Sequence, residues 1–139
     1  LWRWVWPTLQ TAWARPYPMA RVTVDGREVC SATPYVIVGN CPYSAGRFRA
    51  APRAKTDDGL LDVVAVKRFG PLKMISLAVG SLLPSFPDRA DLVYVQGHHV
   101  DLVPVDNTRV PLQLDGDPAG TLPAHFDVLP RACTVLAAP

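Results

Sequence analysis

Three short segments of the chain concentrate residues that could do chemistry, and the first is rich in carboxylates. Asp57 and Asp58 precede Gly59, and Asp62 places a third carboxylate in an otherwise apolar run. Carboxylates and turn carbonyls are ligands that hard cations such as Mg²⁺ or Ca²⁺ prefer. Because Asp-Asp-Gly is also common in ordinary turns, the segment by itself is consistent with either a metal site or a plain turn.

The second segment places a carboxylate at the end of an apolar strand. Residues 110–114 lead directly into Asp115, Gly116 and Asp117. Such a strand is expected to pack into a core and to deliver the carboxylate of Asp115 to its rim. Asp-Gly is also the signature of a hairpin turn, so a purely structural role is the alternative.

The third segment is the loop over residues 40–55, which begins with Asn40 and carries four cations among glycine and serine. These cations are Arg47, Arg49, Arg53 and Lys55. Several cations on one loop could meet a phosphate group or an acidic lipid surface. A loop that is merely solvated is the alternative.

Other classes of site are not indicated. The chain has neither a P-loop nor a Gly-x-Gly-x-x-Gly phosphate loop, and it lacks a Gly-x-Ser-x-Gly elbow. His98, His99 and His125 show no cysteine or carboxylate at the spacing of a zinc site, so we expect no histidine metal site. A net charge of +2 without a dense run of Lys and Arg argues against nucleic-acid binding.

The composition is that of one globular domain of 139 residues. Apolar stretches fall short of the roughly 20 residues of a membrane-spanning helix. Three cysteines, an odd number without metal-ligand spacing, indicate reduced thiols in a cytoplasmic protein. The chain begins at Leu1 without Met, which we interpret as a cut within a longer polypeptide.

The elements that position these segments are mostly strands. The period-two pattern around Asp25-Gly26 predicts a hairpin, and apolar runs predict further strands, including residues 35–38 and 60–66. A helix is predicted to open at Gly70-Pro71, with Leu72, Ile75, Val79 and Leu82 on one face, and another over residues 1–14. Only strands are expected after Pro87. The pattern is typical of a mainly β protein, an antiparallel β-sandwich with one or two helices.

Taken in order, the three segments resemble the diacylglycerol kinase catalytic family, which includes sphingosine kinases and bacterial relatives. The resemblance rests on Val36-Ile37-Val38-Gly39-Asn40, on Pro52-Arg53-Ala54-Lys55-Thr56-Asp57-Asp58-Gly59-Leu60-Leu61-Asp62, and on Leu112-Gln113-Leu114-Asp115-Gly116-Asp117. The chain departs from the family pattern in three places. Ser44-Ala45-Gly46 replaces a triple glycine, Cys41 replaces glycine, and Asp117 replaces glutamate.

The resemblance implies the second domain of the NAD kinase/diacylglycerol kinase-like fold. Residues 1–139 would form the C-terminal β-sandwich half of a two-domain lipid kinase, and the N-terminal half, with its Gly-Gly-Asp-Gly-Thr nucleotide loop, would lie outside this chain. The isolated chain is therefore expected to be inactive.

The resemblance also implies roles for residues, in an ATP-dependent phosphoryl transfer to a lipid hydroxyl. Asp115 would be the general base. Asp117 and Asn40 would line the cleft that receives ATP. Asp57, Asp58 and Asp62 would bind a structural Mg²⁺ or fix the loop. Implied partners are the lipid substrate and the N-terminal domain, with peripheral membrane contact and a homodimer also open. Two alternatives are a non-catalytic β-sandwich that binds lipid or protein, and a relative of the ATP-NAD kinases.

Overall fold

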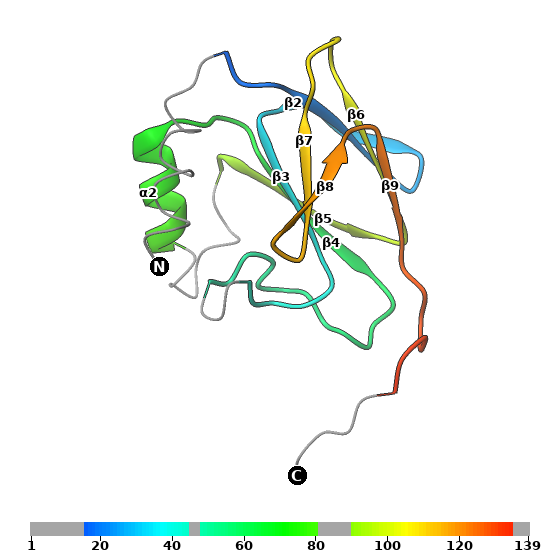
Figure 1. Ribbon diagram of the computed structural model, residues 1–139. Helices are drawn as coiled ribbons and strands as arrows, with labels where there is room; N and C mark the ends of the chain where they lie inside the picture. The colour runs from blue at the N-terminus through cyan, green and yellow to red at the C-terminus, as the bar shows by residue number, and fades with distance from the viewer. Residues whose placement is uncertain (1–15, 45–47, 81–89, 135–139) are drawn as a thin grey trace.

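The computed structural model describes residues 16–44, 48–80 and 90–134, which contain nine strands and one helix (Figure 1). The strands are β1 (Ala20–Val24), β2 (Arg27–Thr33), β3 (Tyr35–Gly39), β4 (Leu61–Val66), β5 (Leu92–Gly97), β6 (His99–Pro104), β7 (Pro111–Leu114), β8 (Asp117–Thr121) and β9 (Ala124–Asp127). The helix is α2 (Pro71–Gly80). The helix predicted over residues 1–14 lies outside the described residues.

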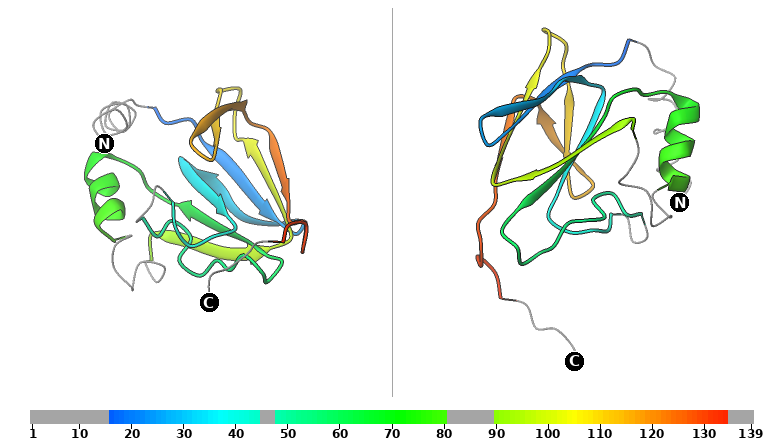
Figure 2. Two further views of the ribbon diagram at one scale, coloured as in Figure 1. Left: turned by 60° about the horizontal axis from the view of Figure 1, so that its bottom comes forward. Right: turned by 180° about the vertical axis from the view of Figure 1, so that it is seen from behind.

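The strands form two antiparallel sheets and a separate hairpin. One sheet has the order β2-β1-β6-β9, the other has the order β3-β4-β5, and β7 pairs only with β8. Figure 2 shows the two sheets from two further sides, with α2 beside them. The predicted mainly β, sandwich-like architecture is confirmed.

The core forms where the two sheets face each other, because each strand alternates its side chains between two faces. The four-stranded sheet contributes Val22, Val100 and Leu102, and β4 contributes Val63 and Ala65 to the same cluster. Val110 and Leu112, at the base of the β7–β8 hairpin, are partly buried against this core. The hairpin is therefore anchored at its base.

Strand β4 is buried on both faces, as its nearly continuous apolar run predicts. Its second face carries Val64 and Val66, which pack with Leu92 and with Leu77 of α2. The helix therefore covers the outer side of the three-stranded sheet. Among the described residues, no helix has both the length and the apolar character needed to cross a bilayer.

The predicted start of α2 at Pro71 is confirmed, but its apolar face is not turned to the core. Leu72, Ile75 and Val79 are 84%, 55% and 56% exposed, while Leu77 makes the contact with the sheet. Leu82 lies outside the described residues. Periodicity identifies residues on one side of a helix, but it does not decide which side meets the sheet.

Candidate functional site

Asp115 lies at the tip of the β7–β8 hairpin. Asp115 and Gly116 form the turn, with φ angles of 49° and 102°, which Asp tolerates and Gly adopts freely. Asp115 is exposed, and no hydrogen bond or ion pair engages its carboxylate within residues 16–44, 48–80 and 90–134. The carboxylate predicted to be the general base is therefore available to a ligand.

The two residues predicted to face ATP are also at the surface. Asp117 is exposed and pairs with Leu114 at the start of β8. Asn40 is exposed and follows the last residue of β3, Gly39, which lies opposite Asp62 on β4. In the described ranges no hydrogen bond or ion pair joins Asn40 to Asp62 or to Asp117. Their predicted roles remain predictions.

Asp62 is the centre of a buried hydrogen-bond network. Its side chain is fully buried. Tyr94 Oη donates to Asp62 Oδ1 at 2.5 Å, and Gln96 Nε2 donates to Asp62 Oδ2 at 3.1 Å. Burial, together with the hydrogen bond to Asp62, raises the pKa of Tyr94 far above its usual value. Both oxygens of Asp62 are thus engaged by protein donors, as a buried carboxylate requires.

The same tyrosine fastens the Arg-bearing loop to the sheet. The backbone N–H of Arg53 donates to Tyr94 Oη at 2.9 Å, and the Arg53 guanidinium lies 4.9 Å from the centre of the Tyr94 ring. Arg49 lies 5.8 Å from the ring of Tyr43. Lys55 is exposed, and Arg47 lies outside the described residues. Two of the predicted cations therefore lie over tyrosine rings: Arg49 over Tyr43 of the same loop, and Arg53 over Tyr94 of β5.

The three carboxylates predicted to share Mg²⁺ are placed differently. Asp57 and Asp58 are exposed in the turn before β4, and Asp58 Oδ1 accepts a hydrogen bond of 2.9 Å from the backbone N–H of Leu60. Asp62, in contrast, is buried in the network with Tyr94. The predicted metal site stays a prediction. Asp57 and Asp58 are exposed, whereas both oxygens of Asp62 already accept hydrogen bonds from Tyr94 and Gln96.

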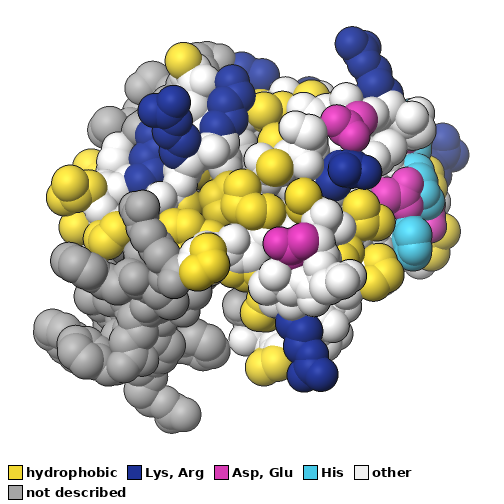
Figure 3. All heavy atoms as spheres, turned by 90° about the horizontal axis from the view of Figure 1, so that it is seen from above, with side chains coloured by type: hydrophobic (Ala, Val, Ile, Leu, Met, Phe, Trp, Pro, Cys, Tyr) yellow, Lys and Arg dark blue, Asp and Glu magenta, His cyan; other side chains and the backbone are white. Residues whose placement is uncertain are grey.

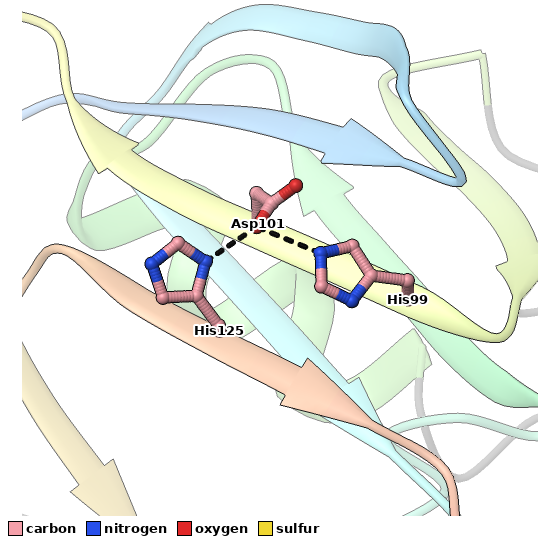
Figure 4. Close-up of side chains that lie close together, drawn as sticks. All are labelled: His99, Asp101 and His125. Carbon is pink, nitrogen blue, oxygen red and sulfur yellow. Dashed lines mark hydrogen bonds and ion pairs between the residues drawn. The ribbon is translucent and has the colours of Figure 1, made fainter.

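A fourth polar cluster, which the sequence analysis passed over, lies on the outer face of the four-stranded sheet. His99 and Asp101 of β6 lie opposite Asp127 and His125 of β9, so each histidine faces an aspartate across the strand pair. Figure 4 shows Asp101 between His99 and His125. Asp101 Oδ1 lies 3.0 Å from His99 Nε2 and 2.5 Å from His125 Nδ1, and His99 Nδ1 lies 2.5 Å from Asp127 Oδ1. Spacing along the sequence indicated no zinc site at these histidines, whereas the folded chain places Asp101 and Asp127 beside them. His-x-Asp occurs twice, at residues 99–101 and 125–127, and this repeat was the missed signal.

Electrostatics inside this cluster favours the charged forms of His99 and Asp101. The hydrogen bond to Asp127 raises the pKa of His99, despite the opposing effect of desolvation. The hydrogen bond from His125 lowers the pKa of Asp101. These shifts come from the contacts themselves, since the side chains remain partly open to solvent.

Comparison with known proteins agrees with this architecture. The "YegS C-terminal NAD kinase beta sandwich-like domain" matches residues 8–137. A probable lipid kinase, YegS-like, from Chromohalobacter salexigens is 34% identical over 82 residues, which are 58% of this chain and 25% of that protein. The chain thus spans about a quarter of that relative.

Solved structures show the same fold. A putative diacylglycerol kinase from Bacillus anthracis str. Sterne superposes with a TM-score of 0.69 at 23% identity, covering 90% of this chain and 42% of that one. A diacylglycerol kinase structure from the same strain gives a TM-score of 0.66 at 19% identity, covering 90% and 42%. The match over residues 8–137 shows that the chain belongs to the family of YegS C-terminal NAD kinase beta sandwich-like domains.

Proposed function

We propose that this domain is the C-terminal half of an ATP-dependent kinase that phosphorylates a lipid hydroxyl, of the diacylglycerol or sphingosine type. The observation that carries the proposal is the exposed, unengaged carboxylate of Asp115 at the tip of an anchored hairpin. Two further observations support it: the lipid kinase that is 34% identical to part of this chain, and the sequence from Pro52 to Asp62, which resembles the diacylglycerol kinase family.

In the proposed reaction, Asp115 accepts the proton of the lipid hydroxyl while the hydroxyl oxygen attacks the γ-phosphorus of ATP. The bond from that phosphorus to the bridging oxygen breaks, and ADP leaves. A carboxylate suffices as the base because phosphoryl transfer depends mainly on positioning and charge neutralisation. Asn40 and Asp117 would lie on the side that receives ATP, which the N-terminal domain would mostly hold.

Magnesium enters the proposal through the exposed carboxylates. Asp57 and Asp58 suit a hard cation, because they lie in a turn and are open to solvent. Asp62 does not share that exposure, so we assign it the role of fixing the loop through Tyr94 and Arg53. When bound, the ion would neutralise the turn and hold its shape. Peripheral membrane contact at the cytoplasmic face belongs to the same proposal.

The proposal is tested in the full-length protein by Asp115→Asn. Asparagine keeps the size and the turn preference but cannot accept the proton, so kcat should fall by about 10²–10⁴-fold, the usual contribution of a general base. The melting temperature and lipid binding should not change. Asp25→Asn, in the Asp-Gly turn that joins β1 to β2, is the matched control and should keep kcat.

Two results would contradict the proposal. If Asp115→Asn kept kcat within a few-fold of the parent, Asp115 would be only a turn residue. If the full-length protein with Asp115 intact failed to phosphorylate any diacylglycerol or sphingosine substrate in the presence of ATP and Mg²⁺, the non-catalytic module would be the better description.

A further inference from the structure

The histidine–aspartate cluster on β6 and β9 has the composition of a metal site, and it lies on a different element from Asp115. Its members are His99, Asp101, His125 and Asp127. Figure 3 shows histidine and acidic side chains gathered at one edge of the molecular surface. An ion could therefore reach these side chains directly from solvent.

The donor atoms already converge. His99, Asp101 and His125 each offer one ligand atom, and these three atoms lie within 4.8 Å of one another. In a tetrahedral zinc site, with bonds of about 2.0–2.2 Å, neighbouring donors are about 3.3 Å apart. The two contacts of Asp101, at 3.0 and 2.5 Å, need only open slightly to admit an ion. Because the histidine side chains are 42% and 64% exposed, small rotations can provide that room.

Asp127 prepares His99 for this role. It lies 2.5 Å from His99 Nδ1, so in the neutral ring Nδ1 would carry the proton and Nε2 would be left to face Asp101 and an incoming ion. A carboxylate that holds the outer nitrogen of a histidine is a common support of metal-bound imidazole, because it fixes the tautomer and the ring orientation. Asp127 is thus a positioning residue, one step removed from the ion.

The chemistry of the donors selects the kind of ion. Two imidazoles and one carboxylate suit first-row transition metals such as Zn²⁺, whereas Mg²⁺ prefers oxygen ligands only. We propose that His99, Asp101 and His125 bind one divalent transition metal ion, for which zinc is the probe. The ion would join β9, an edge strand of the four-stranded sheet, to β6, and solvent would complete its coordination.

Calorimetric titration of the chelator-treated chain with zinc chloride tests this. One zinc ion should bind per chain, and magnesium chloride should not compete. A zinc concentration of about 100 times the dissociation constant should raise the melting temperature by several degrees. Cobalt should give the visible absorption of an ion bound directly by protein ligands.

Variants locate the site. His125→Ala and Asp101→Ala should each weaken zinc binding by at least about tenfold, and Asp127→Asn by roughly tenfold. His98→Ala is the matched control, since His98 is an adjacent histidine that lies near Asp25 instead; it should bind zinc like the parent. His125→Ala serves even if Asp101→Ala fails to fold, because His125 is an exposed side chain on an edge strand. Absence of one-to-one binding, or equal weakening by His98→Ala, would overturn the proposal.

Discussion

The two Asp-Gly turns that close β-hairpins in this domain have similar local structure but different surroundings. Asp25-Gly26 joins β1 to β2, with φ angles of 48° and 76°, and Asp115-Gly116 joins β7 to β8, with 49° and 102°. Asp25 Oδ1 accepts hydrogen bonds of 2.9 Å from the backbone N–H groups of both His98 and His99. These hydrogen bonds hold the pKa of Asp25 below its usual value, and the bond from His99 contributes more than the bond from His98.

Asp115, in contrast, has no such partner among the described residues. Equal backbone geometry therefore does not imply an equal role. One carboxylate ties its turn to the connection between β5 and β6, and the other is left open to a ligand. The comparison makes Asp25 a structural residue and supports the catalytic assignment of Asp115.

The strongest expected effect on stability comes from Gly97→Ala. A Cβ at Gly97 would lie 2.3 Å from Val24 Cγ1 and 2.6 Å from Asp25 Oδ2, so it would push against the base of the Asp25 turn. We expect a loss of about 1–3 kcal/mol in the free energy of unfolding, as overpacking commonly costs. Urea denaturation measures it.

A double variant checks the cause of that loss. In the Val24→Ala background the nearest clashing methyl group is absent, so Gly97→Ala should cost less there, a coupling that contacting residues typically show. An equal cost in both backgrounds would mean that close packing at the Asp25 turn is not the reason.

A smaller difference is expected between Asp25→Ala and Asp115→Ala. Both place alanine in a left-handed conformation and so share that cost. Only Asp25→Ala also removes the acceptor of two backbone N–H groups. The melting temperature of Asp25→Ala should therefore be lower than that of Asp115→Ala, by a few degrees in thermal unfolding followed by circular dichroism. Identical melting temperatures would mean that the hydrogen bonds of Asp25 do not distinguish its turn from that of Asp115.

The smallest expected effect is that of Asp115→Asn on stability. Asparagine also tolerates the left-handed turn, and the carboxylate that it replaces makes no bond within the described residues. The free energy of unfolding should stay within about 0.5 kcal/mol of the parent, as for most surface substitutions. A loss well above about 1 kcal/mol in chemical denaturation would reveal a structural role for Asp115.

Much of the fold could be predicted from the sequence because it follows from local physics. Asp and Gly accept positive φ, so both Asp-Gly hairpin turns could be located. The run from Leu61 to Val66 is apolar except for Asp62, which predicts a strand. Pro71 suits the first turn of a helix, and α2 begins there.

The candidate site could be predicted in part. Asp115 was predicted as the general base because its motif resembles a known family, and the structure places it exposed in a hairpin turn. The separation of Asp62 from Asp57 and Asp58 could not be found, since it depends on Tyr94, which lies 32 residues away along the chain. Sequence neighbours share a site only if their side chains point to the same side of the sheet.

The sequence by itself determined the turns, the strands and the kinds of side chain that each strand carries. Only the tertiary structure decided which hairpin aspartate is held by hydrogen bonds and which side of α2 contacts the sheet. It also decided that the two His-x-Asp segments lie side by side, with each histidine opposite an aspartate. The physical reason is that these outcomes depend on strand register and on packing between distant segments. A one-residue shift between β6 and β9 would break both His–Asp pairs while leaving each local pattern unchanged.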